Sequence, residues 1–164
     1  MVDGLREELE QLRKTYAASR PAARLGVIRQ RLIRAEAEIG PTRLVTVVSA
    51  VEALARSLVV HAPGRPASSS HFRYQQVRMK APLELVEEAL RLYGAGPALE
   101  RYGDETWQLF ELAHLYRNLV VHECTYLGQD KYPALITASE RILEGLVAAG
   151  GLPRLVSEQA RPRD

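Results

Sequence analysis

The residues of this sequence best suited to chemistry are Arg117, Asn118 and His122, which lie in one short stretch. An arginine binds phosphate through its charged fork, an amide orients a neighbouring group, and an imidazole titrates near neutral pH. Cleavage of RNA without a metal needs a base for the ribose 2′-hydroxyl, an acid for the leaving 5′-oxygen, and positive charge on the phosphate. His122 suits the role of base or acid, Arg117 that of phosphate clamp, and Asn118 that of orienting group.

The stretch from Asp104 to Tyr126 is predicted to be a helix with an apolar side and a polar side. The apolar residues at helical spacing are Leu109, Leu112, Ala113, Tyr116 and Val120. At about 100° per residue, one line on the other side holds Trp107, Glu111, His114, Asn118 and His122, with Arg117 beside it. Five residues turn a helix by about 140°, so Arg117 and His122 project in different directions. A bent arginine or a distorted helix is needed to bring them together within one chain.

The spacing of Arg117, Asn118 and His122 resembles the Arg-x4-6-His motif of the HEPN superfamily, all-helical proteins of which many are RNA endonucleases. Asparagine is a common second residue of the motif in that family. The resemblance covers roughly residues 40–150 and implies an all-α, up-and-down bundle of about five to six helices. It also implies an RNA substrate and a homodimer whose two motifs meet at a shared cleft.

A protein antitoxin is a further partner that the resemblance suggests. One subgroup of HEPN toxins, paired with nucleotidyltransferase antitoxins, has a tyrosine two residues after the histidine. Here Cys124 stands at that place and Tyr126 follows two residues later, so the chain departs from the subgroup.

Carboxylates are expected near the arginine, because a two-fold contact at this face would gather several cations. We predict that Glu52, Glu111 or Glu123 lies within salt-bridge reach of Arg117. A structural alternative is that Arg117 only pairs with a neighbouring glutamate, while His122 interacts with carbonyl groups at the helix end.

His114 is assigned a supporting role, with an ordinary partly buried imidazole as the alternative. A metal site formed by His114, His122 and Cys124 is not predicted, because no strong ligand spacing is present. No cofactor is predicted.

The chain is predicted to be one domain of 164 residues, with an N-terminal helical hairpin (1–39), a HEPN-like bundle (40–150) and a loose tail (151–164). In the first helix, Leu5, Leu9, Leu12 and Tyr16 form a narrow seam that packs against another helix. Pro21 begins the second helix, which runs to Gly40.

The third helix, from Arg43 to about His61, is apolar on most sides and is therefore expected at the centre. It contains Arg56-Ser57-Leu58-Val59-Val60-His61, which matches residues 117–122 at every position but one. Because Pro63 and Gly64 follow closely, His61 lies at a helix end, and we favour Arg117 and His122 as the functional pair.

Residues 71–80 mix cations with aromatic rings, a combination suited to phosphate contact and base stacking. The predicted RNA-binding residues are Arg73, Tyr74, Arg78 and Lys80. A short amphipathic helix with Phe72 and Val77 in the core is the alternative interpretation. Further helices are predicted from Pro82 to Gly94 and from about Pro133 to Gly150.

Composition sets the outer bounds on function. A net charge of +2 does not by itself indicate a nucleic-acid-binding protein, so RNA contact must come from a local patch. One cysteine excludes an internal disulfide, and no segment has the roughly 20 apolar residues of a membrane span. We therefore expect a cytoplasmic protein with no membrane partner. The two functional hypotheses are a metal-independent endoribonuclease and a non-catalytic helical module that binds RNA or a protein.

Overall fold

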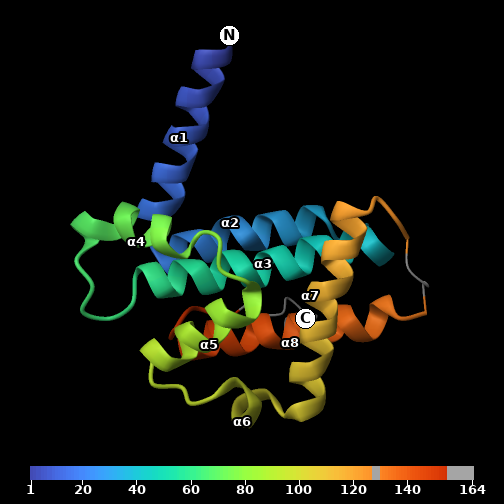
Figure 1. Cartoon of the computed structure of the whole chain (residues 1–164). Helices are drawn as coiled ribbons and strands as arrows, with labels where there is room; N and C mark the ends of the chain where they lie inside the picture. The colour runs from blue at the N-terminus through green and yellow to red at the C-terminus, as the bar shows by residue number, and fades with distance from the viewer. Residues whose placement is uncertain (127–129, 155–164) are drawn as a thin grey trace, which may run out of the picture.

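The computed structural model describes residues 1–126 and 130–154, and every regular element among them is helical (Figure 1). The elements are α1 (Val2–Ala18), α2 (Pro21–Arg34), α3 (Gly40–Val60), the 3-10 turn η1 (Ala67–Ser69), α4 (Ser70–Val77), α5 (Pro82–Leu92), α6 (Ala98–Tyr102), α7 (Asp104–His122) and α8 (Tyr132–Ala149). The predicted all-α class is confirmed. The expected five to six helices are too few, because α1 and the short α4 and α6 bring the described part to eight α-helices. Most of the predicted tail, residues 155–164, lies outside the described residues.

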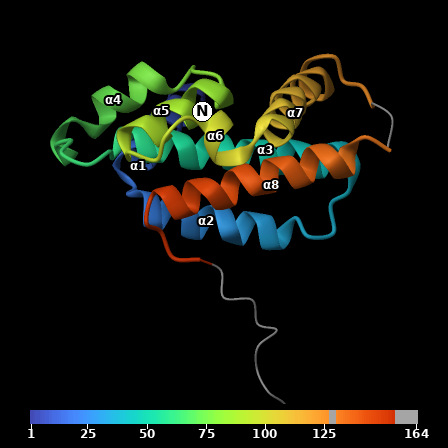
Figure 2. The same cartoon turned by 90° about the horizontal axis from the view of Figure 1, so that it is seen from below.

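Helix α3 is the centre of the molecule. Its fully buried side chains include Leu44, Val47, Val48, Val51 and Leu54. Helices α2, α5, α7 and α8 pack around it, and Figure 2 shows α2 and α8 beside it. A helix that is apolar on nearly every side is stable only where neighbours surround it, which explains this position. None of the helices in the described residues combines the length and the apolarity needed to cross a lipid bilayer.

Prolines mark where several helices begin. Pro21, Pro41, Pro82 and Pro133 occupy the first turns of α2, α3, α5 and α8. A proline lacks the N–H that would be unpaired in a first turn, and its fixed φ suits a helix. The predicted starts at Pro21 and Pro82 are confirmed, although α2 ends at Arg34, earlier than expected.

Helix α7 crosses the other long helices. In Figure 1, α2, α3 and α8 run roughly side by side, whereas α7 runs steeply across them. Its Phe110 and Ala113 are fully buried, and the helix packs against α3 and α8. The helices therefore do not all run up and down, and the crossing decides which side chains of α7 meet α3.

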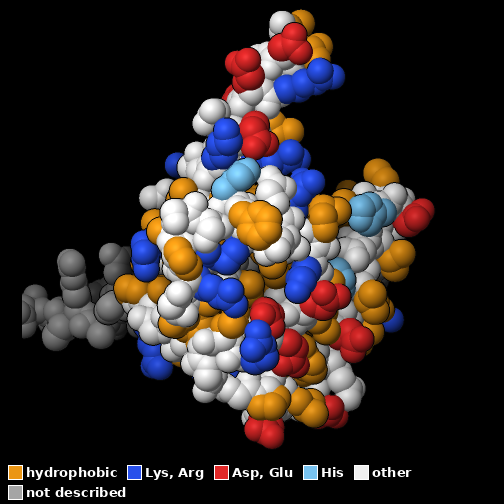
Figure 3. Space-filling view, turned by 60° about the vertical axis from the view of Figure 1, so that its left-hand side comes forward, with side chains coloured by type: hydrophobic (Ala, Val, Ile, Leu, Met, Phe, Trp, Pro, Cys, Tyr) orange, Lys and Arg blue, Asp and Glu red, His pale blue; other side chains and the backbone are white. Residues whose placement is uncertain are grey.

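Helix α1 projects from the rest of the molecule (Figures 1 and 3). We expected it to form a hairpin with α2, but it packs mainly against α4 and α3, and its Tyr16 ring also meets Arg24 of α2. The imidazole Nε2 of His61 lies 2.8 Å from the carbonyl oxygen of Ala17, which ties the end of α1 to the end of α3.

Candidate functional site

The packing of α7 on α3 and α8 separates its inward and outward side chains. Thr106, Phe110 and Ala113 are buried. Trp107 stacks on Tyr102 with ring centroids 6.3 Å apart, and its centroid lies 5.7 Å from that of Phe110. Trp107, which the sequence places on the polar line, is therefore part of the packing.

A polar cluster lies between α3 and α7, formed by Ser49, Glu52, His114, Arg117 and Asn118 (the α3–α7 polar cluster). Arg117 Nη1 donates to Glu52 Oε2 at 3.1 Å and to Ser49 Oγ at 3.5 Å. Arg117 Nε donates to Asn118 Oδ1 at 3.1 Å, and Nη2 donates to His114 Nδ1 at 3.3 Å. The side chains of Arg117 and Glu52 are only 14% and 21% exposed. The guanidinium is thus fixed from several directions.

Glu52 joins the two segments that carry arginine and histidine at the same spacing. Its Oε1 accepts from Arg56 Nη2 at 2.8 Å, while its Oε2 accepts from Arg117. One carboxylate beside two guanidinium groups leaves an excess positive charge, which favours an anion. The prediction of a carboxylate within reach of Arg117 is confirmed by Glu52.

The other predicted supporting residues lie outside the α3–α7 polar cluster. Glu111 and Glu123 are exposed, and neither forms an ion pair within residues 1–126 and 130–154. Tyr126 is exposed as well. Cys124 is exposed and has a φ of 50°, a left-handed conformation just beyond the end of α7.

His114 is held in its neutral form. Burial lowers the pKa of this imidazole, the charge of Arg117 lowers it further, and Glu52 acts in the opposite direction. Because an arginine is always a donor, its contact makes Nδ1 of His114 an acceptor and leaves the proton on Nε2. Asn118 Nδ2, which is also a donor, lies 3.5 Å from that Nε2, so with this tautomer the contact is not a hydrogen bond. His114 therefore orients Arg117 and offers an N–H.

His122 is placed apart from Arg117. It is the last residue of α7 and is exposed. The structure shows no hydrogen bond between His122 and the α3–α7 polar cluster in the part of the chain it describes. The turn of about 140° between Arg117 and His122 is not compensated by a distorted helix. One chain therefore brings together Arg117, Asn118 and His114, but not His122.

An exposed apolar stripe lies beside His122 on the outer side of α7. Leu112, Leu115 and Leu119 are 44%, 50% and 46% exposed (the α7 leucine face). The expectation that Leu112 faces the core is therefore wrong. At about 100° per residue, Leu115 lies within about 20° of His122 round the helix, and Leu119 within about 60°. A surface that covered these leucines would also reach the histidine.

Arg73 is the first cation of residues 71–80, the stretch predicted to bind RNA, and it is held by hydrogen bonds within the chain. Arg73 Nε donates to the Val60 carbonyl at 2.6 Å, and its Nη1 donates to the Pro66 carbonyl at 2.8 Å and to Ser69 Oγ at 2.6 Å. The side chain thus pairs backbone oxygens at the end of α3 and in the following loop.

The remaining residues of that stretch differ in exposure. Tyr74 is half-buried and packs on the core, whereas Arg78 is half-buried and Lys80 is exposed. Only the last of the four predicted RNA-binding side chains is fully open to solvent.

Arg56 and His61, which have the same spacing as Arg117 and His122, both have partners within the fold. Arg56 pairs with Glu52, and His61 is buried and contacts the carbonyl of Ala17. Burial lowers the pKa of His61, which keeps the imidazole neutral. His61 therefore ties the end of α1 to α3, while Arg56 is bound to Glu52 within α3.

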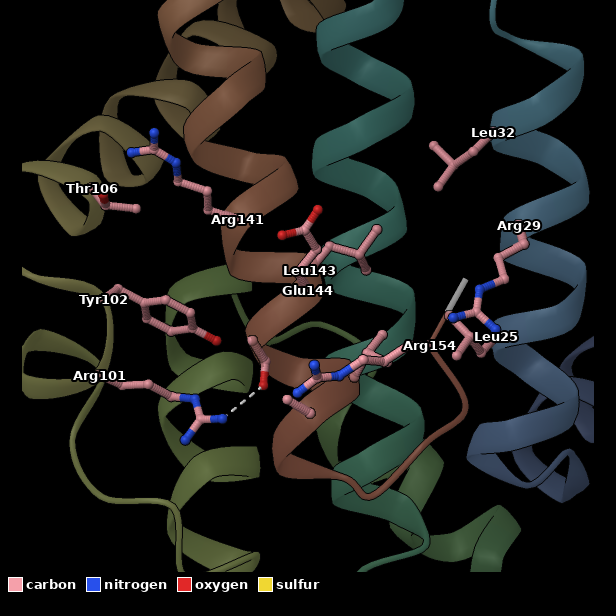
Figure 4. A pocket seen from close by; sticks show the side chains of 13 residues that line it. Leu25, Arg29, Leu32, Arg101, Tyr102, Thr106, Arg141, Leu143, Glu144 and Arg154 are labelled. Carbon is pink, nitrogen blue, oxygen red and sulfur yellow. Dashed lines mark hydrogen bonds between the residues drawn. The ribbon is translucent and has the colours of Figure 1, made fainter. Parts of the chain in front are cut away.

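A groove lined by arginines lies between α2, α6 and α8 (Figure 4). Its volume is about 820 Å³, and its four arginines are Arg29, Arg101, Arg141 and Arg154 (the arginine groove). Arg101 Nη2 donates to the Gly145 carbonyl at 3.3 Å, and Arg29 donates to the carbonyl of Pro153. Glu144 also lines the groove, but within the described residues no carboxylate lies at ion-pair distance from any of the four arginines. Charge of this kind attracts anions.

Ser49 is the cluster member that the sequence reasoning missed. A signal was present, because Ser49, Glu52 and Arg56 are polar residues at helical spacing in an otherwise apolar helix.

In the described part of the chain, no three His, Cys, Asp or Glu side chains are grouped so as to hold a metal ion. Comparison of the chain with protein-family models, curated proteins and solved structures yields no match.

Proposed function

We propose that this protein is a metal-independent RNA endonuclease of the HEPN type that acts as a homodimer. The observation that supports it is the fixed guanidinium of Arg117, held by Glu52, Asn118 and His114 at the surface between α3 and α7. A prearranged cation is what a developing phosphorane needs, since no reorganisation is then required during the reaction.

The proposed reaction is transfer of the phosphate to the neighbouring ribose oxygen. A base takes the proton of the 2′-hydroxyl, the 2′-oxygen attacks phosphorus, and the bond to the 5′-oxygen breaks as an acid protonates it. The products are a 2′,3′-cyclic phosphate and a 5′-hydroxyl. Arg117 binds the phosphate oxygens, Asn118 orients Arg117, and His122 transfers a proton.

Within one chain His122 is separated from Arg117, and a second copy of the chain would supply the histidine that is missing. Two copies supply two His122 imidazoles, one for the base and one for the acid, which a single chain lacks. The α7 leucine face lies beside His122, so a contact that buried it would bring each His122 toward the other chain. The shared cleft would carry the excess positive charge of the α3–α7 polar cluster.

The test is incubation of the purified protein with single-stranded and structured RNA in EDTA. We expect cleavage with 2′,3′-cyclic phosphate ends that is lost in His122→Ala, and loss of growth inhibition by the same substitution when the protein is overproduced. Gln108→Ala, which changes an exposed side chain of α7 outside the α3–α7 polar cluster, is the control and should cleave like the wild type. Unchanged cleavage in His122→Ala contradicts the assignment.

A second candidate function is RNA binding without cleavage, and the arginine groove is the observation that favours it. Arg117 already has a carboxylate partner, whereas the groove arginines have none among the described residues. Unneutralised arginines bind phosphates and release counterions on doing so.

Salt-dependent binding distinguishes the two functions. If the groove binds RNA, Arg101→Gln with Arg141→Gln should weaken binding and, for single-stranded RNA, reduce the salt slope by about 0.7 for each phosphate that is no longer neutralised. Arg6→Gln on α1 is the control. RNA that is bound but not consumed, with no effect of His122→Ala, would support the non-catalytic function.

A further inference from the structure

We propose that α1 pairs with α1 of a second copy of the chain as a parallel two-stranded coiled coil. Val2, Leu5, Leu9, Leu12 and Tyr16 alternate at spacings of three and four residues, which is the a and d pattern of a heptad repeat. An average of 3.5 residues keeps such a seam facing one partner helix along its whole length. The inference concerns assembly and does not rest on RNA cleavage.

The seam (Val2, Leu5, Leu9, Leu12 and Tyr16) is uncovered within the chain. Its side chains are 61%, 60%, 49%, 42% and 40% exposed, in chain order. Tyr16 lies under the guanidinium of Arg24, 4.8 Å from ring centroid to Cζ, so the free part runs from Val2 to Leu12. Figures 1 and 3 show this part of the helix standing clear of the body. Several large apolar side chains on one exposed face indicate a missing partner.

Apart from the Tyr16–Arg24 contact, the contacts of α1 described here are made from another side of the helix. Ala17 is buried, and Glu10 pairs with His71 of α4 at 3.6 Å. Both residues fall at heptad position b, about 130° round the helix from the middle of the seam. The body therefore anchors α1 and leaves the seam open to a second chain.

The charges beside the seam select a second copy in parallel orientation. Glu8 falls at position g and Arg13 at position e of the next heptad, the two positions that face each other across a parallel pair. Two symmetric Glu8–Arg13 ion pairs follow, and neither residue has an ion-pair partner within its own described chain. An antiparallel pair would place Arg6 beside Arg13 of the other chain, which is repulsive.

The polar side of α1 disfavours a lipid surface as the partner. It mixes the carboxylates of Asp3, Glu7, Glu8 and Glu10 with the cations of Arg6, Arg13 and Lys14. Helices that lie on anionic membranes are rich in lysine and arginine on that side, without such an excess of carboxylates. Self-complementary charges and a continuous seam together favour a second copy.

The first test is the mass of the full chain in solution by sedimentation equilibrium. The wild type should be a dimer, and Leu5→Ser with Leu9→Ser should weaken it at least tenfold without loss of helical circular dichroism, because both leucines are exposed. Leu99→Ser on α6 alters a leucine that is 50% exposed and lies on neither face, so it is the matched control and should leave association unchanged. The α1 substitutions are also measured with Leu115→Ser and Leu119→Ser present, which removes the α7 leucine face as a second contact. A monomeric wild type, or a dimer that survives the α1 substitutions in that background, overturns the proposal.

The second test determines whether the two α1 helices pair in parallel or antiparallel orientation. In a parallel pair, Arg13→Glu places a carboxylate opposite Glu8 of the other chain and should weaken association at least threefold, whereas in an antiparallel pair it would strengthen association. Lys14→Glu changes the charge equally at an outward position and should have no effect. Glu8→Arg combined with Arg13→Glu should restore the wild-type dissociation constant. Stronger association of the Arg13→Glu variant would overturn the parallel arrangement, whatever the result of the RNA assay.

Discussion

The guanidinium of Arg117 on α7 and the carboxylate of Glu52 on α3 form an ion pair of 3.1 Å. Glu52 also binds Arg56, so one carboxylate serves two cations that are far apart in the chain. The pair keeps Arg117 between the two helices and away from the outer side of α7, where His122 lies. A phosphate at this site would have to bind beside Glu52, using the excess positive charge.

Substituting Glu52 should separate stability from anion binding. Glu52→Gln removes the counter-charge of two partly buried guanidinium groups, and we expect a loss of about 1–3 kcal/mol in the free energy of unfolding. RNA affinity should hold or rise, because the α3–α7 polar cluster becomes more positive. Urea unfolding and filter binding measure the two effects. Glu88→Gln, which breaks the more exposed pair with Arg91, is the control and should change stability less.

Stability should fall as the pH drops below about 6.5, the ordinary pKa of an unfolded imidazole. The pKa values of His61 and His114 are lowered mainly by burial, so the unfolded chain takes up protons first. Their contribution is complete above that pH and is lost as the pH falls through the folded pKa values. Urea midpoints measured between pH 7.5 and 5 check this. His114→Gln should flatten the dependence, and a slope equal to that of the wild type would contradict the prediction.

The α7 leucine face should be required for RNA cleavage if the two active motifs meet there. Leu115→Ser with Leu119→Ser should lower the cleavage rate at least tenfold. Because both side chains are about half exposed, the change in unfolding free energy should stay within about 1 kcal/mol. Leu99→Ser on α6 alters a leucine of equal exposure, 50%, and should cleave normally. Full activity of the α7 variant would leave the shared cleft without support.

Gly145 should tolerate no side chain, since α6 packs directly on it. A Cβ at Gly145 would lie 2.2 Å from Cε1 of Tyr102, and Tyr102 donates to the carbonyl of Ile142 at 3.1 Å. Gly145→Ala should therefore destabilise the protein by about 1–3 kcal/mol. Gly26→Ala in α2 meets nothing within 4 Å and should stabilise it by about 0.5–1 kcal/mol. Thermal and urea unfolding compare the two, and equal shifts would contradict the packing argument.

Local patterns along the chain were enough to predict the helical class, the central position of α3 and the starts of helices at Pro21 and Pro82. They suffice because side chains three and four residues apart share one face of a helix and because proline suits a first turn. The same rules placed Arg117 and His122 about 140° apart, and the undistorted α7 keeps that separation. They also identified the α1 seam as a surface that needs a partner helix.

Which distant residues meet depends on how the helices pack in three dimensions. The crossing of α7 over α3 selects Glu52, rather than Glu111 or Glu123, as the partner of Arg117, and it buries Trp107 against Tyr102 and Phe110. Periodicity gives a direction round each helix but not the angle or rotation at which two helices pack. For the same reason, α1 packs mainly against α4, because contacts between segments distant in sequence depend on the packing of the whole chain.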